Sequence, residues 1–164
     1  LRVGHQHRDG DLPKVFGEVG LGERGGFASV AIGSGETFRS GPAHGAPPQN
    51  IRLSADDFLL DHLGGGFDLI YFTEAAAIPE PLQTVVATTR HRGVPLHVIA
   101  VGAASPVAGA DLTLADADGH FRRRYGVQAS GAAYLLRPDQ HVCARWLTLD
   151  ATRLQAALNS ALPQ

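Results

Sequence analysis

Two short patterns and one thiol are the places where this sequence could carry chemistry. Cys143 is the single cysteine of the 164 residues, so it could act as a lone nucleophile but cannot form an internal disulfide. The run from Gly20 to Gly25 has GxGxxG spacing, which binds a pyrophosphate when a strand precedes it and a helix follows. His5 and His7 are spaced to fall on one face of a strand, where they could bind a metal ion.

The surrounding sequence argues against a nucleotide or metal site at these positions. The GxGxxG run follows DLPKVFGEV, which contains a proline, and precedes the strand-like GFASVAIG, so we interpret it as a turn. No third ligand lies near His5 and His7. No GxSxG motif is present, and Ser34 and Ser105 have no neighbouring histidine. The other histidines occur singly and are interpreted as surface or hydrogen-bonded residues: His44, His62, His91, His97, His120 and His141.

The composition is that of one globular domain with a real core. Hydrophobic residues make up 44% of the chain and charged residues 18%, and the formal net charge is -2. No long run of one charge sign is present, which argues against nucleic acid or an anionic membrane as a partner. Arg122 to Arg124 are interpreted as a solvated helix face. No apolar run approaches the roughly 20 residues that span a bilayer.

The start of the chain predicts a fragment of a larger protein. The sequence contains no methionine and begins with Leu1, whereas a complete translation product begins with methionine. Residues 1 to 20 carry charged and histidine side chains that a signal peptide lacks. The lone cysteine suits a reducing compartment, and we expect a cytoplasmic location.

Two regions are predicted along the chain. Residues 1–50 are expected to be a linker and N-terminal extension with one strand at 27–32, because glycine and proline are concentrated there and 34–50 has the composition of a loop. Residues 51–164 are expected to form the compact domain.

The compact region alternates between strand and helix patterns. Ser54 is expected to cap a first helix, favoured by Asp57 and ended by Gly64 to Gly66. The further predicted elements, in chain order, are a buried strand at 67–73, a helix at 79–92 ended by Gly93, a buried strand at 95–102, an extended piece at 111–116, a short helix at 119–125, a hairpin at 131–146, and a last helix that Asp150 caps and in which Leu154, Leu158 and Leu162 recur.

This order predicts an α/β fold of the thioredoxin-like class, with a central mixed sheet flanked by helices. The alternating part requires parallel strands with crossovers, and the hairpin is antiparallel. In thioredoxin-like enzymes the reactive cysteine follows the first central strand. Here that position reads TEAAAIPEP, residues 73–81, and the proline expected before the hairpin is missing from QASGAAY, residues 128–134. Cys143 is expected to be a small core residue, so the fold is predicted without redox cysteines.

The hairpin contains a well-defined turn. Pro138 occupies the second position of Arg137-Pro138-Asp139-Gln140, where its fixed φ suits a type I turn. Tyr134, Leu136, Val142 and Trp146 are expected to pack, with Arg137, Gln140 and Arg145 facing water. We interpret this hairpin as structural.

Three stretches resemble one protein family. YGVQASGAAYLLRPDQHVCARW, residues 125–146, is similar to the segment "YG…G…LVRPDGYVAWR" near the carboxyl end of many FAD-dependent aromatic hydroxylases. LLDHLGGGFDLIYF, residues 59–72, and GPAHGAPPQNIRL, residues 41–53, are similar to the segments that enter the same domain. The matching hairpin positions are Tyr125, Gly126, Gly131, Leu136, Arg137, Pro138, Asp139, Val142, Ala144 and Arg145.

The resemblance implies the C-terminal thioredoxin-like domain of a flavoprotein monooxygenase of the phenol hydroxylase or polyketide hydroxylase type. In the parent, FAD, NAD(P)H and O2 would hydroxylate an aromatic substrate, and the FAD-binding and substrate domains would precede this one. The fragment itself is expected to bind no cofactor or metal, to be non-catalytic, and to support those domains or a homodimer. The sequence departs from the family at Gln140, where a turn glycine is usual, and over residues 1–40.

Two alternatives remain open from the sequence. The first is a free-standing, redox-inactive assembly module of thioredoxin-like fold. The second is a thiol enzyme of peroxiredoxin type that works through Cys143, which requires a depressed thiol pKa.

Overall fold

The computed structural model describes residues 37–163. The His5 and His7 pair, the GxGxxG run and the strand predicted at 27–32 lie outside the described residues. Within them, no helix has the length and apolar character needed to cross a membrane.

Among residues 37–163, five strands and three α-helices follow the order predicted from residue 67 onward. A four-residue 3-10 turn, η1, precedes them. The elements are η1 Leu59–His62, β1 Phe67–Thr73, α1 Glu80–His91, β2 Leu96–Gly102, β3 Leu112–Leu114, α2 His120–Tyr125, β4 Ala133–Leu136, β5 Val142–Trp146 and α3 Ala151–Ala161.

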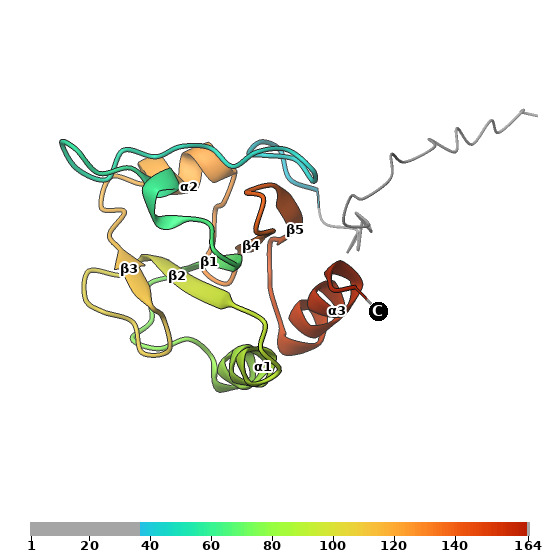
Figure 1. Ribbon diagram of the computed structural model, residues 1–164. Helices are drawn as coiled ribbons and strands as arrows, with labels where there is room; N and C mark the ends of the chain where they lie inside the picture. Colours follow the sequence, from blue (N-terminus) through green and yellow to red (C-terminus); the bar gives the residue numbers. More distant parts are fainter. Residues whose placement is uncertain (1–36, 164) are drawn as a thin grey trace, which may run out of the picture.

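The strands form one mixed sheet in the order β3-β2-β1-β4-β5 (Figure 1). Strands β1, β2 and β3 are parallel, β4 is antiparallel to β1, and β5 is antiparallel to β4. The predicted parallel crossovers and antiparallel hairpin are therefore confirmed. Every residue of β1 is buried, as expected for the central strand of a sheet covered on both faces.

Each face of the sheet carries its own hydrophobic core. Helices α1 and α3 contact each other on one face, over Leu69, Val98 and Trp146. On the other face, α2, η1 and the segment leading into β1 cover Ile70, Phe72 and other side chains (Figure 1). Alternate residues of β1 thus belong to opposite cores, as the period of two in a strand requires.

The first predicted helix is wrong. Ser54 lies in a bend, and its N–H donates to the Asp57 carbonyl at 3.2 Å. Only η1 is helical here, and its N-cap is Phe58, whose N–H donates to the Asp61 carboxylate at 3.2 Å. The Leu53 N–H also donates to the Asp57 carbonyl, at 2.8 Å, so residues 53–57 close a turn in place of the first turn of a helix.

The capping residues predicted for α1 and α3 lie at the ends of these helices in the structure. Helix α1 begins after Pro79, its N-cap, and Gly93 follows it with φ of +85°. Asp150 caps α3 by accepting the Arg153 N–H at 2.8 Å. Leu154 and Leu158 are buried, as their helical spacing predicted.

The hairpin forms the predicted turn, and its two strands pair with a shift in register. The Gln140 N–H donates to the Arg137 carbonyl at 2.9 Å, which closes the predicted four-residue turn. Gln140 is the single non-glycine residue with positive φ, +61°, among the described residues, so it adopts the conformation that glycine favours. A register shift beside Leu135 and Leu136 places Val142 in the α2-side core and Trp146 in the α1-side core.

Candidate functional site

The edge where thioredoxin-like enzymes place their reactive thiol has little charge here. Glu74 follows β1 directly and pairs with Arg122 at 3.0 Å. Beyond it, residues 75–79 after β1 and residues 104–110 after β2 contain no charged side chain. The two loops are joined because the Ile78 N–H donates to the Ala108 carbonyl and the Ala108 N–H donates to the Ala76 carbonyl, both at 2.8 Å. We name these two loops the neutral edge. Its alanines are exposed except the half-buried Ala110, and none of its side chains is a thiol.

The one thiol lies elsewhere and is poorly suited to reaction. Cys143 is half-buried in β5, away from the amino end of α1. Burial raises the pKa of its thiol, and nearby Arg137 lowers it only in part. Since the thiolate is the reactive form, this position argues against the peroxiredoxin-type alternative. Cys143 is less buried than a core residue, which corrects the expectation that it is part of the core.

The signature residues Tyr125 and Gly126 lie where α2 meets residues 38–49, which we call the incoming segment. The buried Tyr125 hydroxyl donates to the Gln49 carbonyl at 2.7 Å, and its own carbonyl accepts from the Tyr134 hydroxyl. Burial raises the pKa of Tyr125, and the neighbouring Tyr134 adds to the effect. Gly126 has φ of +67°, and a Cβ there would overlap the Ser40 backbone. Residues 40–49 are therefore packed tightly against this signature.

The hairpin part of the signature also binds this segment. Arg145 donates to the Pro42 carbonyl at 3.0 Å, and its guanidinium lies 4.4 Å from the centre of the Phe38 ring. The prediction that Arg145 faces water is wrong, because the incoming segment covers it. Arg137 is likewise only 14% exposed, contrary to its predicted water-facing position.

The other signature positions shape the turn and its approach. Arg137 donates twice to the Asp139 carboxylate, at 3.1 and 2.9 Å, across Pro138. Burial would raise the pKa of Asp139, but the Arg137 guanidinium holds it below its usual value. Gly131 has φ of +97°, and its N–H donates to the Phe72 carbonyl at 2.8 Å. These contacts are structural. That the following seven residues belong to a family signature stays a prediction: Tyr125, Gly126, Gly131, Arg137, Pro138, Asp139 and Arg145.

The opposite edge of the sheet holds a cleft that the sequence reasoning missed. Its volume is about 620 Å³, and its walls include His62, Arg90, His97 and the loop Gly64–Gly66. His62 lies 2.7 Å from the Asp57 carboxylate, and Arg90 donates to the Leu96 carbonyl at 2.7 Å.

A buried carboxylate lies behind this cleft. Asp68 is 0% exposed, and its Oδ2 accepts the Gly64 N–H at 2.9 Å. Its Oδ1 has no hydrogen-bond partner and lies 3.5 Å from Nδ1 of His97. The sequence could have indicated this carboxylate, because Asp68 is the one charged residue in the otherwise apolar strand FDLIYFT, residues 67–73. His97 was interpreted as a single, scattered histidine, although β1 and β2 pair it directly with Asp68.

The side chains at the two edges do not gather into a metal centre in the part of the chain that the structure describes. Among residues 37–163, no group of three or more histidine, cysteine, aspartate or glutamate side chains could hold a metal ion. The side chains at the cleft hold neighbouring backbone in place, because Asp68 accepts from the Gly64 N–H and Arg90 donates to the Leu96 carbonyl.

The chain is similar in structure to flavin-dependent enzymes that are much longer. It matches the rebeccamycin biosynthetic enzyme RebC with reduced flavin, with a TM-score of 0.54, 23% identity, and coverage of 82% of this chain and 21% of that chain. It matches aklavinone-11 hydroxylase in complex with FAD and aklavinone with a TM-score of 0.51, 25% identity, and coverage of 72% and 20%. It matches the flavin-dependent monooxygenase PieE in complex with FAD and substrate with a TM-score of 0.51, 24% identity, and coverage of 76% and 20%.

No protein-family model matches the sequence, and no curated protein matches it. The structural matches confirm the thioredoxin-like fold class, and the lone Cys143 confirms that it carries no redox pair. The chain spans about a fifth of the length of the solved flavoenzymes that it matches. The resemblance to FAD-dependent hydroxylases is therefore confirmed, and the chain has the fold of one domain of those enzymes.

Proposed function

We propose that this chain is the non-catalytic C-terminal domain of an FAD-dependent monooxygenase that hydroxylates an aromatic substrate with NAD(P)H and O2. One observation carries the proposal. The chain has the fold of one domain that makes up about a fifth of several flavin-dependent enzymes. In this chain, exposed alanines occupy the position where thioredoxin-like enzymes carry the reactive thiol. The domain supports the flavin reaction by its contacts and binds neither FAD nor NAD(P)H.

The partner of this domain is the remainder of its own polypeptide, namely the FAD-binding and substrate domains. The neutral edge is suited to such a contact because its own side chains are uncharged, and the adjacent Glu74 is already paired with Arg122 at 3.0 Å. A homodimer contact is a further part of the proposal. A reducing cytoplasm suits a chain whose single cysteine can form no internal disulfide.

The first experiment is to read the coding DNA upstream of Leu1. We expect an open frame that continues for roughly two further domains, with a strand–GxGxxG–helix unit near its start. A start codon a few residues upstream would contradict the proposal and favour the free-standing assembly module.

A matched pair of substitutions in the parent enzyme tests the contact. Ala76→Arg at the neutral edge should lower the melting temperature of the parent and release FAD more readily, because the introduced charge would be buried in the contact. Ala87→Arg, at an exposed alanine of α1, is the control and should leave FAD retention unchanged. In the isolated 164-residue chain both variants should unfold like the unaltered chain. Equal FAD retention in the two parent variants would exclude the neutral edge as the contact.

The claim that this domain binds no cofactor has its own test. Titrating the 164-residue chain into FAD should leave the flavin fluorescence unchanged. Saturable quenching at micromolar protein would contradict a purely supporting role.

A further inference from the structure

The incoming segment has no helix or strand of its own, yet it is bonded to the hairpin at several points. The Arg145 guanidinium donates to the Pro42 carbonyl at 3.0 Å. The Gly45 N–H donates to the Val142 carbonyl at 2.8 Å, and the Val142 N–H donates back to the segment. A surface loop that only connects two parts of a chain forms few such bonds. The segment is therefore bound to the domain along the outer strand of the hairpin.

The segment is also held by direct contact between backbones. An added Cβ at Gly41 would lie 2.4 Å from the Tyr125 carbonyl oxygen, and one at Gly126 would lie 2.3 Å from the Ser40 carbonyl oxygen. No side chain fits between the two backbones at either position. At the far end of the segment, the Tyr125 hydroxyl donates to the Gln49 carbonyl at 2.7 Å. Both halves of the segment therefore have a fixed position on the domain.

The first residues of the segment are fixed by an aromatic ring. The Phe38 ring meets the Tyr134 ring edge-on, with the two centroids 5.7 Å apart. The Arg145 guanidinium lies over the other side of this contact, 4.4 Å from the centre of the Phe38 ring. Such ring and cation contacts favour defined geometries. The point at which the chain enters the domain is therefore determined by side chains of the hairpin.

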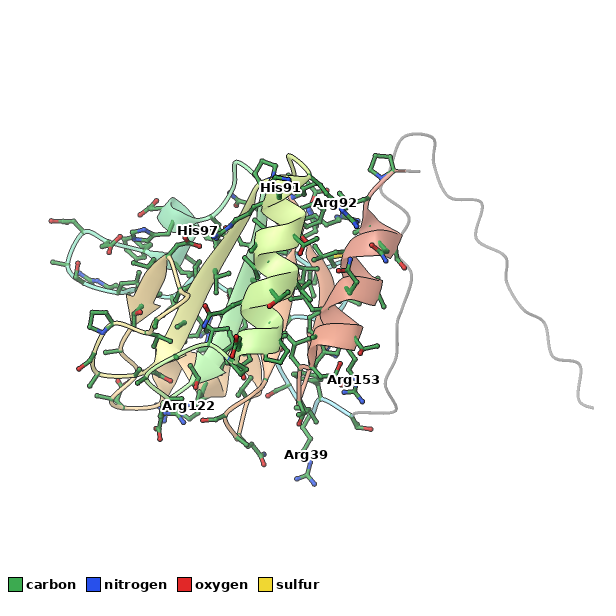
Figure 2. The ribbon with its side chains drawn as sticks, turned by 90° about the horizontal axis from the view of Figure 1, so that it is seen from below. Arg39, His91, Arg92, His97, Arg122 and Arg153 are labelled. Atoms are coloured by element: carbon green, nitrogen blue, oxygen red, sulfur yellow. The ribbon has the colours of Figure 1, made fainter. Side chains whose placement is uncertain are left out.

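This entry point lies at the end of the sheet that carries the neutral edge. Thr37 and Arg39 share the walls of a pocket of about 400 Å³ with Ala132. The Ala132 carbonyl accepts the Phe72 N–H at 2.9 Å, near the carboxyl end of β1. Figure 2 shows Arg39 at the same end of the sheet as Arg122. Since the neutral edge follows the carboxyl ends of β1 and β2, the polypeptide before Thr37 joins the domain at that end.

We propose that Tyr125, Gly126 and Arg145 are positioning residues, which bind the incoming segment and thereby hold the preceding domains of the parent against the neutral edge. The inference rests on the proposed function, because it takes the preceding part of the same polypeptide as the partner. A bound segment allows the polypeptide little freedom to swing to the other end of the sheet. It thus raises the effective concentration of the preceding domains at the neutral edge.

Amide hydrogen exchange of the 164-residue chain, followed by NMR, tests the binding of the segment. The Gly45 amide should be protected in the unaltered chain. Arg145→Ala and Tyr125→Phe should each raise its exchange rate by about tenfold, because each removes a bond that opposes local opening. The Gly131 amide, which donates to the Phe72 carbonyl at 2.8 Å, reports on the sheet and should keep its rate.

Arg123→Ala is the matched control for these variants. Arg123 lies on α2 and donates to the Asp118 carbonyl at 2.7 Å, so its loss should leave the Gly45 rate unchanged. If Arg145→Ala does not fold, Tyr125→Phe decides the question. An unprotected Gly45 amide in the unaltered chain, or equal rates in the Arg145 and Arg123 variants, would overturn the inference.

A thiol at the neutral edge tests the positioning in the parent enzyme. In a Cys143→Ala background, Ala76→Cys should be alkylated more slowly in the parent than in the 164-residue chain, because the preceding domains cover it. Adding Arg145→Ala should raise the rate in the parent at least about fivefold, and adding Arg123→Ala should not. A purely structural role of Arg145 would leave this rate unchanged and would contradict the inference.

The two proposals fail in different ways. A start codon just upstream of Leu1 would remove the parent and with it the proposed function, whatever the exchange of Gly45. A freely exchanging Gly45 amide, or alkylation in the parent that ignores Arg145→Ala, would remove the positioning role and leave the proposed function intact.

Discussion

The two ends of the sheet differ in how each holds its buried carboxylate. Asp116, near α2, accepts the Phe121 N–H at 2.9 Å on one oxygen and the Arg122 N–H at 3.0 Å on the other. Asp68, at the cleft, has one oxygen bonded to the Gly64 N–H, whereas the other has no hydrogen-bond partner and lies 3.5 Å from Nδ1 of His97. Figure 2 places Arg122 and His97, the side chains beside these two carboxylates, at opposite ends of the sheet.

This difference separates a buried carboxylate that is fully hydrogen-bonded from one that is bonded on one side only. Both oxygens of Asp116 accept from backbone N–H groups, and the Arg122 guanidinium adds an ion pair at 3.4 Å. The second oxygen of Asp68 faces only the His97 ring, at 3.5 Å. An unsatisfied buried oxygen is costly, so the carboxylate beside α2 is the better stabilised of the two.

The largest expected effect tests how tightly the cleft end is packed. Gly66→Ala should destabilise the chain by about 3 kcal/mol, because the added Cβ would lie 2.5 Å from the Pro95 side chain. The control Gly65→Ala has no atom within 4 Å of the added Cβ and should cost only about 1 kcal/mol for its positive φ. Urea unfolding of both variants measures the difference, and equal losses would mean that the loop moves freely away from β2.

The next effect compares the two carboxylates directly. Asp116→Asn should cost about 2 kcal/mol at pH 8, because an amide can accept at only one of the two oxygen positions. Asp68→Asn should cost less than about 1 kcal/mol at the same pH, because it also removes a buried charge. Urea unfolding at pH 8 gives both values. A larger loss for Asp68→Asn than for Asp116→Asn would reverse the comparison.

A thiol placed at the neutral edge would sharpen the contrast with Cys143. In a Cys143→Ala background, Ala76→Cys should be alkylated by iodoacetamide at least about tenfold faster at pH 7.5 than Cys143 in the unaltered chain. Position 76 is exposed, whereas burial raises the pKa of Cys143. Rates of alkylation followed by mass spectrometry measure the ratio, and a faster reaction at Cys143 would reopen the thiol-enzyme alternative.

The smallest expected effect concerns the hairpin turn that touches the cleft loop. Gln140→Gly removes the unfavourable φ of +61° but also loses the side-chain bond to the Leu63 carbonyl. Glycine additionally gains freedom in the unfolded chain. These contributions nearly cancel, so the free energy of unfolding should change by less than about 0.5 kcal/mol. A loss above about 1 kcal/mol would show that the bond to Leu63 is a main support of the loop.

Local patterns predicted most elements correctly. The continuous apolar run at 67–73, the proline before α1 and the cap at Asp150 each place an element near its observed bounds. The exception is the helix expected from Ser54, since the Leu53 and Ser54 N–H groups turn back to the Asp57 carbonyl and close a tight turn there.

The candidate site was less predictable because its parts are distant in the sequence. Asp68 and His97 are 29 positions apart, and only the parallel register of β1 and β2 brings them together. In the same way, Arg145 was expected in water because nothing near it in the sequence indicates that Phe38 and Pro42 cover it.

The sequence by itself determined the order of the elements, the mixed topology and the absence of a redox cysteine pair, because these depend on residue type and on periodicity along the chain. Only the tertiary structure decided which polar groups share an environment. Proximity between strands and burial beneath a distant segment set the cost of a charge, and neither is written in the spacing of residues. The contact between Asp68 and His97 therefore became apparent only when β2 was placed beside β1.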